Sequence, residues 1–268
     1  MGSPGAPVPS NAVTAFVAVA CGVLGLAVGS FLNVVIHRLP EKRSVVRPRS
    51  RCPQCGTELA NRDNIPVASW LLLRGRCRTC EAPISVRYPL IELGTAVLFA
   101  AAGVRFGAAW ELPAYLLLFA SLLAISAIDL ERYIIPNRIV YPTLFAAIPL
   151  LAAAALLDGD GFRVRDAAIG AGAAWLALLV IHLVQPRGMG FGDVRLAAVL
   201  GLYLGWLDLT LVLLGLMLGF LLGAVVGLGL VVTGVRSRKD AVPFGPFLAA
   251  GAVLAILFSR QLLDVYGV

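Results

Sequence analysis

The chain has 268 residues and a net charge of +7 at pH 7, with 59% hydrophobic and only 14% charged residues. About one residue in four is charged in a typical soluble domain, and the mean hydropathy here is +0.89. Eleven of the 22 Lys and Arg residues lie between Arg38 and Arg87. Such clustering is typical of a cytosolic loop in a membrane protein. A nucleic-acid-binding protein would be expected to carry its positive charge along more of the chain. We therefore expect a membrane protein that contacts lipid and binds no nucleic acid.

The first apolar run, AVTAFVAVACGVLGLAVGSFLNVVIH, occupies residues 12–37. No Lys or Arg precedes residue 38, so the run lacks the basic flank of a cleavable signal peptide, and it is too long for the apolar part of one. We expect it to be retained as the first membrane-spanning helix.

Two C-x-x-C pairs stand in the basic loop that follows. They are Cys52 with Cys55 and Cys77 with Cys80, separated by 21 residues, which is close to the spacing of a four-thiolate zinc site. Two disulfides or four idle thiols are the alternative, but the cytosol keeps thiols reduced. Four thiolates leave no open position for water, so we expect a structural zinc ion. Cys21 stands alone in the first helix and is expected to be a small buried residue.

Seven further apolar segments follow the loop. Since about 20 helical residues span the bilayer core, the sequence predicts an all-α polytopic membrane protein with about eight transmembrane helices. Its cytosolic zinc-bound loop lies between the first and second helices. We divide the chain into a tail with the first helix (1–37), the zinc-binding loop (38–88) and a membrane core (89–268). The seven later helices are predicted near residues 89–105, 113–129, 139–157, 167–185, 194–207, 209–234 and 243–262.

If the loop at residues 38–88 is cytosolic, the side of the membrane on which every later loop lies follows by alternation, and the remaining basic residues test this orientation. Alternating the loops from there places 18 Lys and Arg residues inside and four outside, as expected when basic loops stay in the cytosol. The N-terminus is then predicted to lie outside. The four outside residues are Arg105, Arg163, Arg165 and Arg260.

Two aspartates stand at predicted cytosolic helix ends. Asp129 precedes the stretch IIPN, and Asp193 follows the glycine-rich stretch GMGFG. Ionisable residues at the edge of the hydrocarbon are costly and are candidates for function. Two neighbouring carboxylates share one proton, so one can take a proton from water while the other donates to a carbonyl oxygen. Gly190 and Gly192 would let a peptide approach. The pattern favours an aspartic protease site.

Other interpretations of these residues stay open. Both aspartates could be interfacial helix caps, with Asp129 paired to Arg132 and Asp193 paired to Arg195. A nucleotide-binding loop is disfavoured, because GMGFGD lacks the G-x-G-x-x-G spacing and no lysine follows it. His37 and His182 lie near the same face, and we expect them to be hydrogen-bonded or interface-directed helix residues.

Several motifs, taken in order, resemble the type IV prepilin peptidases, which are membrane aspartic proteases of the GxGD class. The resemblance covers most of residues 29–251. Its motifs are GSFLNVVIHRLP, CPQCG, CRTC, DNIPVASWLLLRGRC, ISVRYPLIEL, IDLERYIIPN, GMGFGDVRL and PFGPFLAAG.

The resemblance implies roles for individual residues. Asp129 and Asp193 become the catalytic aspartates, and Cys52, Cys55, Cys77 and Cys80 become the zinc ligands. The family cuts the positively charged leader from prepilins and pseudopilins after a glycine, on the cytosolic side of the bacterial inner membrane. Members with this cysteine loop commonly also methylate the new N-terminus with S-adenosylmethionine. The resemblance implies that the loop is the methyltransferase part and makes Glu92 the candidate cofactor-binding residue. An alternative explains Glu92 equally well, since an acidic side chain is favourable at the start of a helix.

Two other functions are compatible with the same residues. A presenilin-like protease would cut inside the helices of other proteins, and it would need deeper aspartates. A non-catalytic assembly or transport protein would use the aspartates as a proton or ion site, which leaves the glycine spacing unexplained.

Overall fold

The computed structural model describes residues 11–267 except 48, 187, 236 and 238–241, and this part of the chain is helical with no β-strand. The apolar runs form helices because lipid offers no partner for backbone N–H and C=O groups. The elements are α1 (Asn11–Arg38), η1 (Asn61–Asn64), α2 (Ala68–Leu72), α3 (Arg87–Phe106), α4 (Leu112–Arg132), α5 (Asn137–Asp158), α6 (Phe162–Val184), α7 (Phe191–Leu207), α8 (Leu209–Val232), α9 (Gly245–Leu257) and α10 (Ser259–Tyr266).

Each predicted membrane segment coincides with a helix, but the predicted number of spans is not confirmed. Among the described residues, six helices are long and apolar enough to cross a bilayer, or seven if α9 and α10 count as one span. α7 has only 17 residues and is not among them. The predicted break after residue 207 is present, because Asp208 ends α7 and its carboxylate accepts the Thr210 N–H of α8 at 2.6 Å.

The segment predicted as one helix near residues 243–262 forms two helices, α9 and α10. The chain bends by 80° between α9 and α10. At the bend Phe258 leaves the helical conformation, and the buried Ser259 hydroxyl accepts a hydrogen bond from Arg105 of α3 at 2.7 Å. The polar residues of α10 follow this bend, and Arg260, Gln261 and Asp264 are exposed.

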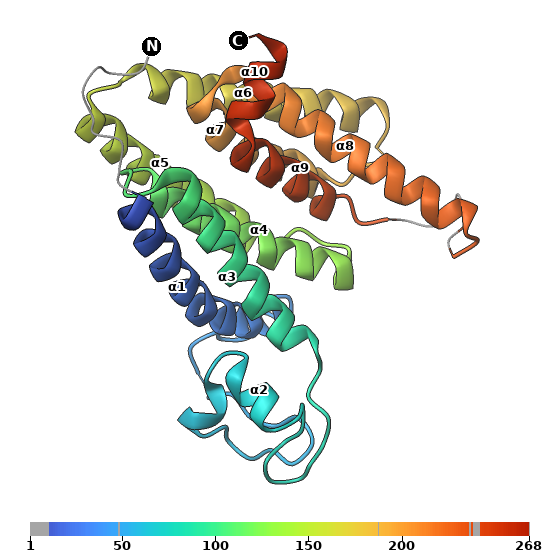
Figure 1. Ribbon diagram of the computed structural model, residues 1–268. Coiled ribbons are helices and arrows are strands. Elements are labelled where there is room, and N and C mark those ends of the chain that lie inside the picture. Colours follow the sequence, from blue (N-terminus) through green and yellow to red (C-terminus); the bar gives the residue numbers. More distant parts are fainter. Residues whose placement is uncertain (1–10, 48, 187, 236, 238–241, 268) are drawn as a thin grey trace.

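The membrane helices pack in two groups, and close backbone approaches hold each group together. α1 lies along α3 and α4, while α6, α7, α8 and α9 form the second group (Figure 1). α1 and α3 touch at Gly29, where an added Cβ would lie 2.7 Å from the Cα of Glu92. α6 and α7 touch at Gly201, where a Cβ would lie 2.2 Å from the carbonyl oxygen of Gly170. Small residues permit this packing between membrane helices.

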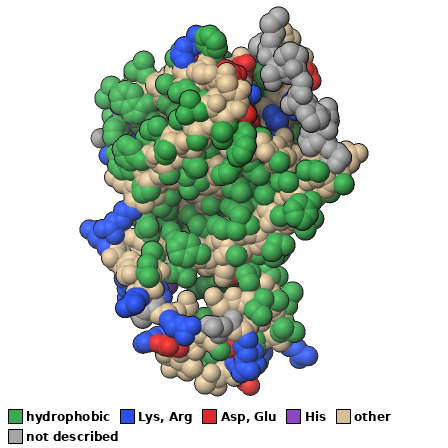
Figure 2. Space-filling view, turned by 90° about the vertical axis from the view of Figure 1, so that its left-hand side faces the viewer, with side chains coloured by type: hydrophobic (Ala, Val, Ile, Leu, Met, Phe, Trp, Pro, Cys, Tyr) green, Lys and Arg blue, Asp and Glu red, His purple; other side chains and the backbone are tan. Residues whose placement is uncertain are grey.

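α4 and α7 form the centre of the protein. Tyr115, Phe119, Tyr203 and Trp206 are almost completely buried there, and the Tyr115 hydroxyl donates to the carbonyl oxygen of Tyr203 at 2.8 Å. On the face that Figure 2 shows, apolar side chains cover the helical part, whereas many Lys and Arg side chains gather on the lower lobe. This distribution suits helices surrounded by lipid.

The segment between α1 and α3 forms the lower lobe, which contains η1 and α2 and projects beyond the ends of the helices (Figure 1). The lobe carries nine of the 18 basic residues that the sequence places in the cytosol, and Arg38 and Arg87 lie at its two ends. The first ten residues of the predicted N-terminal part lie outside the described residues, as do four residues of the inside charge count, namely Arg187, Arg236, Arg238 and Lys239.

Candidate functional site

Asp129 lies in the last turn of α4, which continues to Arg132, three residues beyond the predicted end. Its side chain is buried, and Oδ2 accepts the backbone N–H of Gly245, the first residue of α9, at 3.0 Å. Gly245 is needed here because a Cβ at this position would lie 2.8 Å from that same Oδ2. Asp129 is thus held by a backbone donor from a helix 116 residues away in sequence.

Asp193 lies in the first turn of α7 and is also buried. Its Oδ2 accepts the N–H of Gly190 at 3.1 Å, and its own N–H donates to the carbonyl oxygen of Gly190. The glycine-rich stretch therefore turns into α7 by pairing with the aspartate. Oδ1 of Asp193 is buried and has no hydrogen-bond partner among the described residues. An unpaired buried carboxylate oxygen is free to bind water or a substrate group.

The structure brings the two aspartates together. Their carboxylates are close enough to interact electrostatically, although they lie 64 positions apart in the sequence. Ile135, in the connection from α4 to α5, lies between the segments that carry them. A Cβ on Gly192 would lie 2.9 Å from Ile135, and one on Gly245 would lie 3.1 Å from it. Gly245 and Ile135 thus complete the site, and sequence reasoning did not assign either residue to it.

The arginines proposed as partners in the capping interpretation bind elsewhere. Arg132 forms an ion pair with Glu41 at 3.5 Å, and Arg195 donates to the side-chain oxygen of Asn137 at 2.7 Å. In the described part of the chain, neither arginine is paired with Asp129 or Asp193. Asp193 does hold the first turn of α7, so the capping role and the pairing of the two carboxylates coexist.

His182 is hydrogen-bonded, as expected of a helix residue. The His182 ring of α6 forms a hydrogen bond with the carbonyl oxygen of Met189 at 2.8 Å and packs edge-on against Phe191. It therefore steadies the stretch before Asp193. His37 is exposed near the end of α1 and lines a cavity beside the lower lobe.

The four paired cysteines form one cluster in the lower lobe. The four sulfur atoms of Cys52, Cys55, Cys77 and Cys80 all lie within 4.8 Å of one another. Four sulfurs placed tetrahedrally at about 2.3 Å from one zinc ion would be about 3.8 Å apart, and the sulfurs of Cys52 and Cys80 are 3.8 Å apart. The cluster therefore fits a single zinc ion. Cys21 is buried in the core, as predicted.

The two cysteine pairs share one local structure. In the first, Gly56 N–H donates to the carbonyl oxygen of Cys52 at 2.9 Å, and in the second, Glu81 N–H donates to that of Cys77 at 3.0 Å. Gly56 has φ of 69° and Glu81 has φ of 57°. Glu81 thus adopts the left-handed conformation that Gly56 takes easily, at a cost that glycine does not incur.

Side-chain contacts tie the rest of the lobe to this cluster and to the helices. Arg78, next to Cys77, donates to Asp63 of η1 at 2.6 Å, and this hydrogen bond holds the pKa of the Asp63 carboxyl below its ordinary value. Glu92 of α3 is buried, and its Oε2 accepts the N–H of Val67 at 2.7 Å. Val67 has φ of 60°, which is unfavourable for a β-branched residue. Glu92 thus anchors a strained point of the lobe.

Comparison with known proteins places both halves of this arrangement in one family. Residues 23–106 match the bacterial peptidase A24 N-terminal domain, and residues 116–232 match the type IV leader peptidase family. No solved structure matches the chain.

Relatives named "Prepilin leader peptidase/N-methyltransferase" match over most of their length. The protein of Aeromonas hydrophila is 38% identical over 91% of each chain, and that of Burkholderia pseudomallei strain 1026b is 38% identical over 99% of this chain and 96% of its own. The Myxococcus xanthus protein is 48% identical over 79% of this chain and 63% of its own. With its paired aspartates and four-cysteine lobe, the chain belongs to the type IV leader peptidase family.

Proposed function

We propose that this protein is a membrane aspartic endopeptidase that removes the leader from type IV prepilins or pseudopilins, cutting after a glycine. We further propose that it methylates the new N-terminus. The observation that carries the peptidase assignment is the proximity of two buried carboxylates, Asp129 from α4 and Asp193 from α7, beside backbone glycines. Peptide hydrolysis by an aspartic protease requires such a pair.

The chemistry follows from the two carboxylates. The ionised member takes a proton from a water molecule, whose oxygen attacks the peptide carbonyl carbon. The protonated member donates to the carbonyl oxygen, and the amine then leaves with a proton as the C–N bond breaks. Oδ1 of Asp193, which has no partner in the described chain, is available to hold the attacking water.

The position of the aspartates favours a leader junction as the point of cleavage. Asp129 lies three residues from the end of α4, and Asp193 is the third residue of α7. Both lie near helix ends, whereas cleavage inside a substrate helix requires deeper carboxylates. The substrate helix stays in the bilayer while its basic leader reaches the site.

The site faces the cytosol of a bacterium in our proposal, in the inner membrane and with the N-terminus outside. The concentration of Lys and Arg in the lobe supports this orientation. The proposal includes eight spans, with the short, largely buried α7 as one and α9 with α10 as the last. It also keeps three parts, namely residues 1–37, the zinc-binding loop 38–88 and the peptidase core 89–268.

Methyl transfer is assigned to the lobe and the start of α3. S-adenosylmethionine would supply a methyl group as its C–S bond breaks, with the electron pair staying on sulfur and the amine proton leaving to water. Glu92 is our candidate for holding this methyl donor, since it joins α3 to the lobe through Val67. The zinc ion bound by the four cysteines would keep the lobe folded.

The decisive experiment incubates the purified protein with a prepilin, with and without S-adenosylmethionine, and measures the product by mass spectrometry. We expect a leaderless pilin in both reactions and an added CH₂ group only when the methyl donor is present. An intact prepilin would refute the peptidase. A leaderless product that never gains the added mass would leave a peptidase alone.

Replacing Glu92 by glutamine should separate the two reactions. The glutamine side chain keeps an oxygen that can accept the Val67 N–H, so the lobe stays attached, but the negative charge is lost. We expect leader cleavage and zinc content to stay near wild type, and methylation of the pilin N-terminus to fall about tenfold or more. Mass spectrometry of the processed pilin measures both. Glu41→Gln, on an exposed loop residue, is the control. Normal methylation by Glu92→Gln would reduce Glu92 to a structural acid.

Replacing Gly245 by alanine should impair cleavage through Asp129. The new Cβ would lie 2.8 Å from Oδ2 of Asp129 and 3.1 Å from Ile135, so the carboxylate must move. Displacement of a reacting group by about 1 Å can cost roughly 100-fold in rate, and we expect a loss of that order in the initial cleavage rate. Gly227→Ala on α8 is the matched control, because nothing lies within 4 Å of its new Cβ. Equal rates for the two variants would contradict the role of Gly245.

A further inference from the structure

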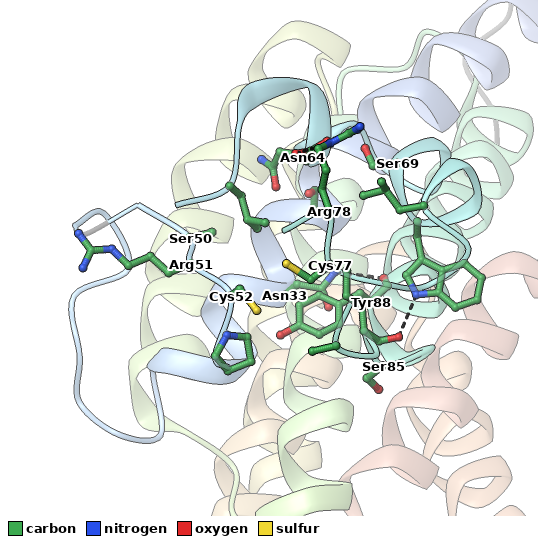
Figure 3. Close-up of a pocket in the computed structure, with 18 of the residues that line it drawn as sticks. Asn33, Ser50, Arg51, Cys52, Asn64, Ser69, Cys77, Arg78, Ser85 and Tyr88 are labelled. Carbon is green, nitrogen blue, oxygen red and sulfur yellow. Dashed lines mark hydrogen bonds and ion pairs between the residues drawn. The ribbon is translucent and has the colours of Figure 1, made fainter. Parts of the chain in front are cut away.

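A cavity of about 420 Å³ lies between the lobe and the ends of α1 and α3 (Figure 3). Its volume is within the range of small-molecule binding sites. Residues from α1, α2, α3 and both cysteine pairs line it, among them Asn33, Trp70, Cys52, Cys77, Tyr88 and Glu92. The cavity is thus closed on one side by membrane helices and on the other by the proposed zinc site.

Asn33 of α1 presents an unpaired oxygen in this region. The side chain is only 3% exposed, and its Nδ2 donates to the carbonyl oxygen of Tyr88 at 3.1 Å. Because a carbonyl oxygen can only accept, this contact fixes which end of the amide is nitrogen. Oδ1 has no hydrogen-bond partner within the described residues. A buried amide oxygen normally accepts a hydrogen bond, so this atom is available to a donor group of a ligand.

The buried polar groups of the lining offer acceptors to a ligand that carries N–H groups. Three arginines of the lining are engaged by other protein groups: Arg38 donates to the Ser44 carbonyl oxygen, Arg51 pairs with Glu58, and Arg78 pairs with Asp63. Oδ1 of Asn33 has no hydrogen-bond partner in the described chain, and Glu92, whose Oε2 accepts the Val67 N–H, is a buried acid of the lining. Arg51 and Arg78 are each paired with a carboxylate, whereas Arg38 donates, among the described residues, only to a neutral carbonyl oxygen.

We propose that this cavity binds the methyl donor, with Oδ1 of Asn33 accepting one of its N–H groups and the Glu92 carboxylate facing its positive charge. S-adenosylmethionine carries two positively charged groups, a sulfonium and an ammonium, and its ammonium and adenine amino groups can donate N–H. These groups suit a carboxylate and an amide oxygen in a cavity of this size. The inference rests on the methyl-transfer part of the proposed function, and it adds the location of the site and the role of Asn33.

Equilibrium binding of radiolabelled S-adenosylmethionine to the purified full-length protein tests the proposal. Asn33→Leu replaces the amide by an apolar side chain of similar size, and we expect its dissociation constant to rise about tenfold or more. Phe31→Leu is the matched control, since Phe31 is an α1 residue with 52% exposure that does not line the cavity. It should bind like the wild type.

The outcomes separate this inference from the function on which it rests. If the wild type binds and transfers the methyl group and Asn33→Leu binds equally well, the Asn33 assignment is wrong and a water molecule satisfies its oxygen. If the wild type neither binds the methyl donor nor methylates the pilin, both the methyl-transfer activity and the proposed binding site are refuted. Should Asn33→Leu lose zinc, which would indicate misfolding of the lobe, Asn33→Ala takes its place in the same measurement.

Discussion

Replacement of Asp129 or Asp193 by asparagine is expected to reduce leader cleavage by about 10²- to 10⁴-fold, the range for losing one positioned acid or base. Asparagine has the shape of aspartate and can still accept the N–H of Gly245 or Gly190 through its amide oxygen. It cannot take a proton from water or carry one to the carbonyl. Membrane insertion and zinc content should therefore stay unchanged while the cleavage rate, measured on a purified prepilin, collapses.

The double variant sharpens this prediction. Two carboxylates that act as one unit lose their function together, so effects on rate are not additive. We expect Asp129→Asn with Asp193→Asn to be about as slow as the slower single variant. Asp158→Asn is the control, because Asp158 is exposed at the end of α5. Full cleavage by either single variant would eliminate the pair as the catalytic centre and would favour a structural or ion-binding role.

Patterns within single segments predicted much of the site. Apolar runs set the positions of the membrane helices, and the spacing of Cys52, Cys55, Cys77 and Cys80 predicted one cluster, which the sulfur positions support. The alternation of loops placed Asp129 and Asp193 at the same end, and in the structure Ile135 lies against both Gly192, next to Asp193, and Gly245, which binds Asp129. These features follow from local composition and from the length of a span, both of which a sequence displays directly.

Contacts between distant segments could not be predicted in this way. The N–H that Gly245 donates to Asp129 and the carboxylate that Glu92 offers to Val67 depend on how helices pack, and no local pattern signals either. The unpaired oxygen of Asn33 is similar, since Asn33 lies in an apolar helix and only the neighbouring Tyr88 carbonyl defines its orientation.

The bend after α9 has a related cause. Apolar content continues past residue 257, so the sequence favours a single helix over residues 243–262. The contact that accompanies the bend joins Ser259 to Arg105, which is 154 positions earlier. A buried hydroxyl paired with a charged side chain fixes the chain there, and α10 turns away with its polar residues exposed. Tertiary contacts of this kind override the local preference of a segment.

Replacement of any one of the four paired cysteines by serine is expected to remove the zinc ion from the protein. A hydroxyl is a poor ligand where a thiolate is required, and the cluster offers four sulfurs with no other Cys or His in the group. Metal analysis of the reduced wild type should find one zinc per chain. Cys21→Ser is the matched control, because Cys21 is buried in α1, away from the cluster, and it should keep the metal.

Loss of zinc should unfold the lobe while the membrane helices stay folded. The lobe has only one 3₁₀ turn and a five-residue helix, and zinc binding supplies folding free energy that so small a segment lacks, on the order of 10 kcal/mol in zinc-finger peptides. Limited proteolysis should then cut between α1 and α3 in Cys52→Ser and Cys77→Ser but not in Cys21→Ser. Because Cys52 and Cys77 also line the cavity beside Glu92, methyl-donor binding should disappear with the metal. A fully reduced, active protein that contains no zinc would overturn the structural role of the cluster.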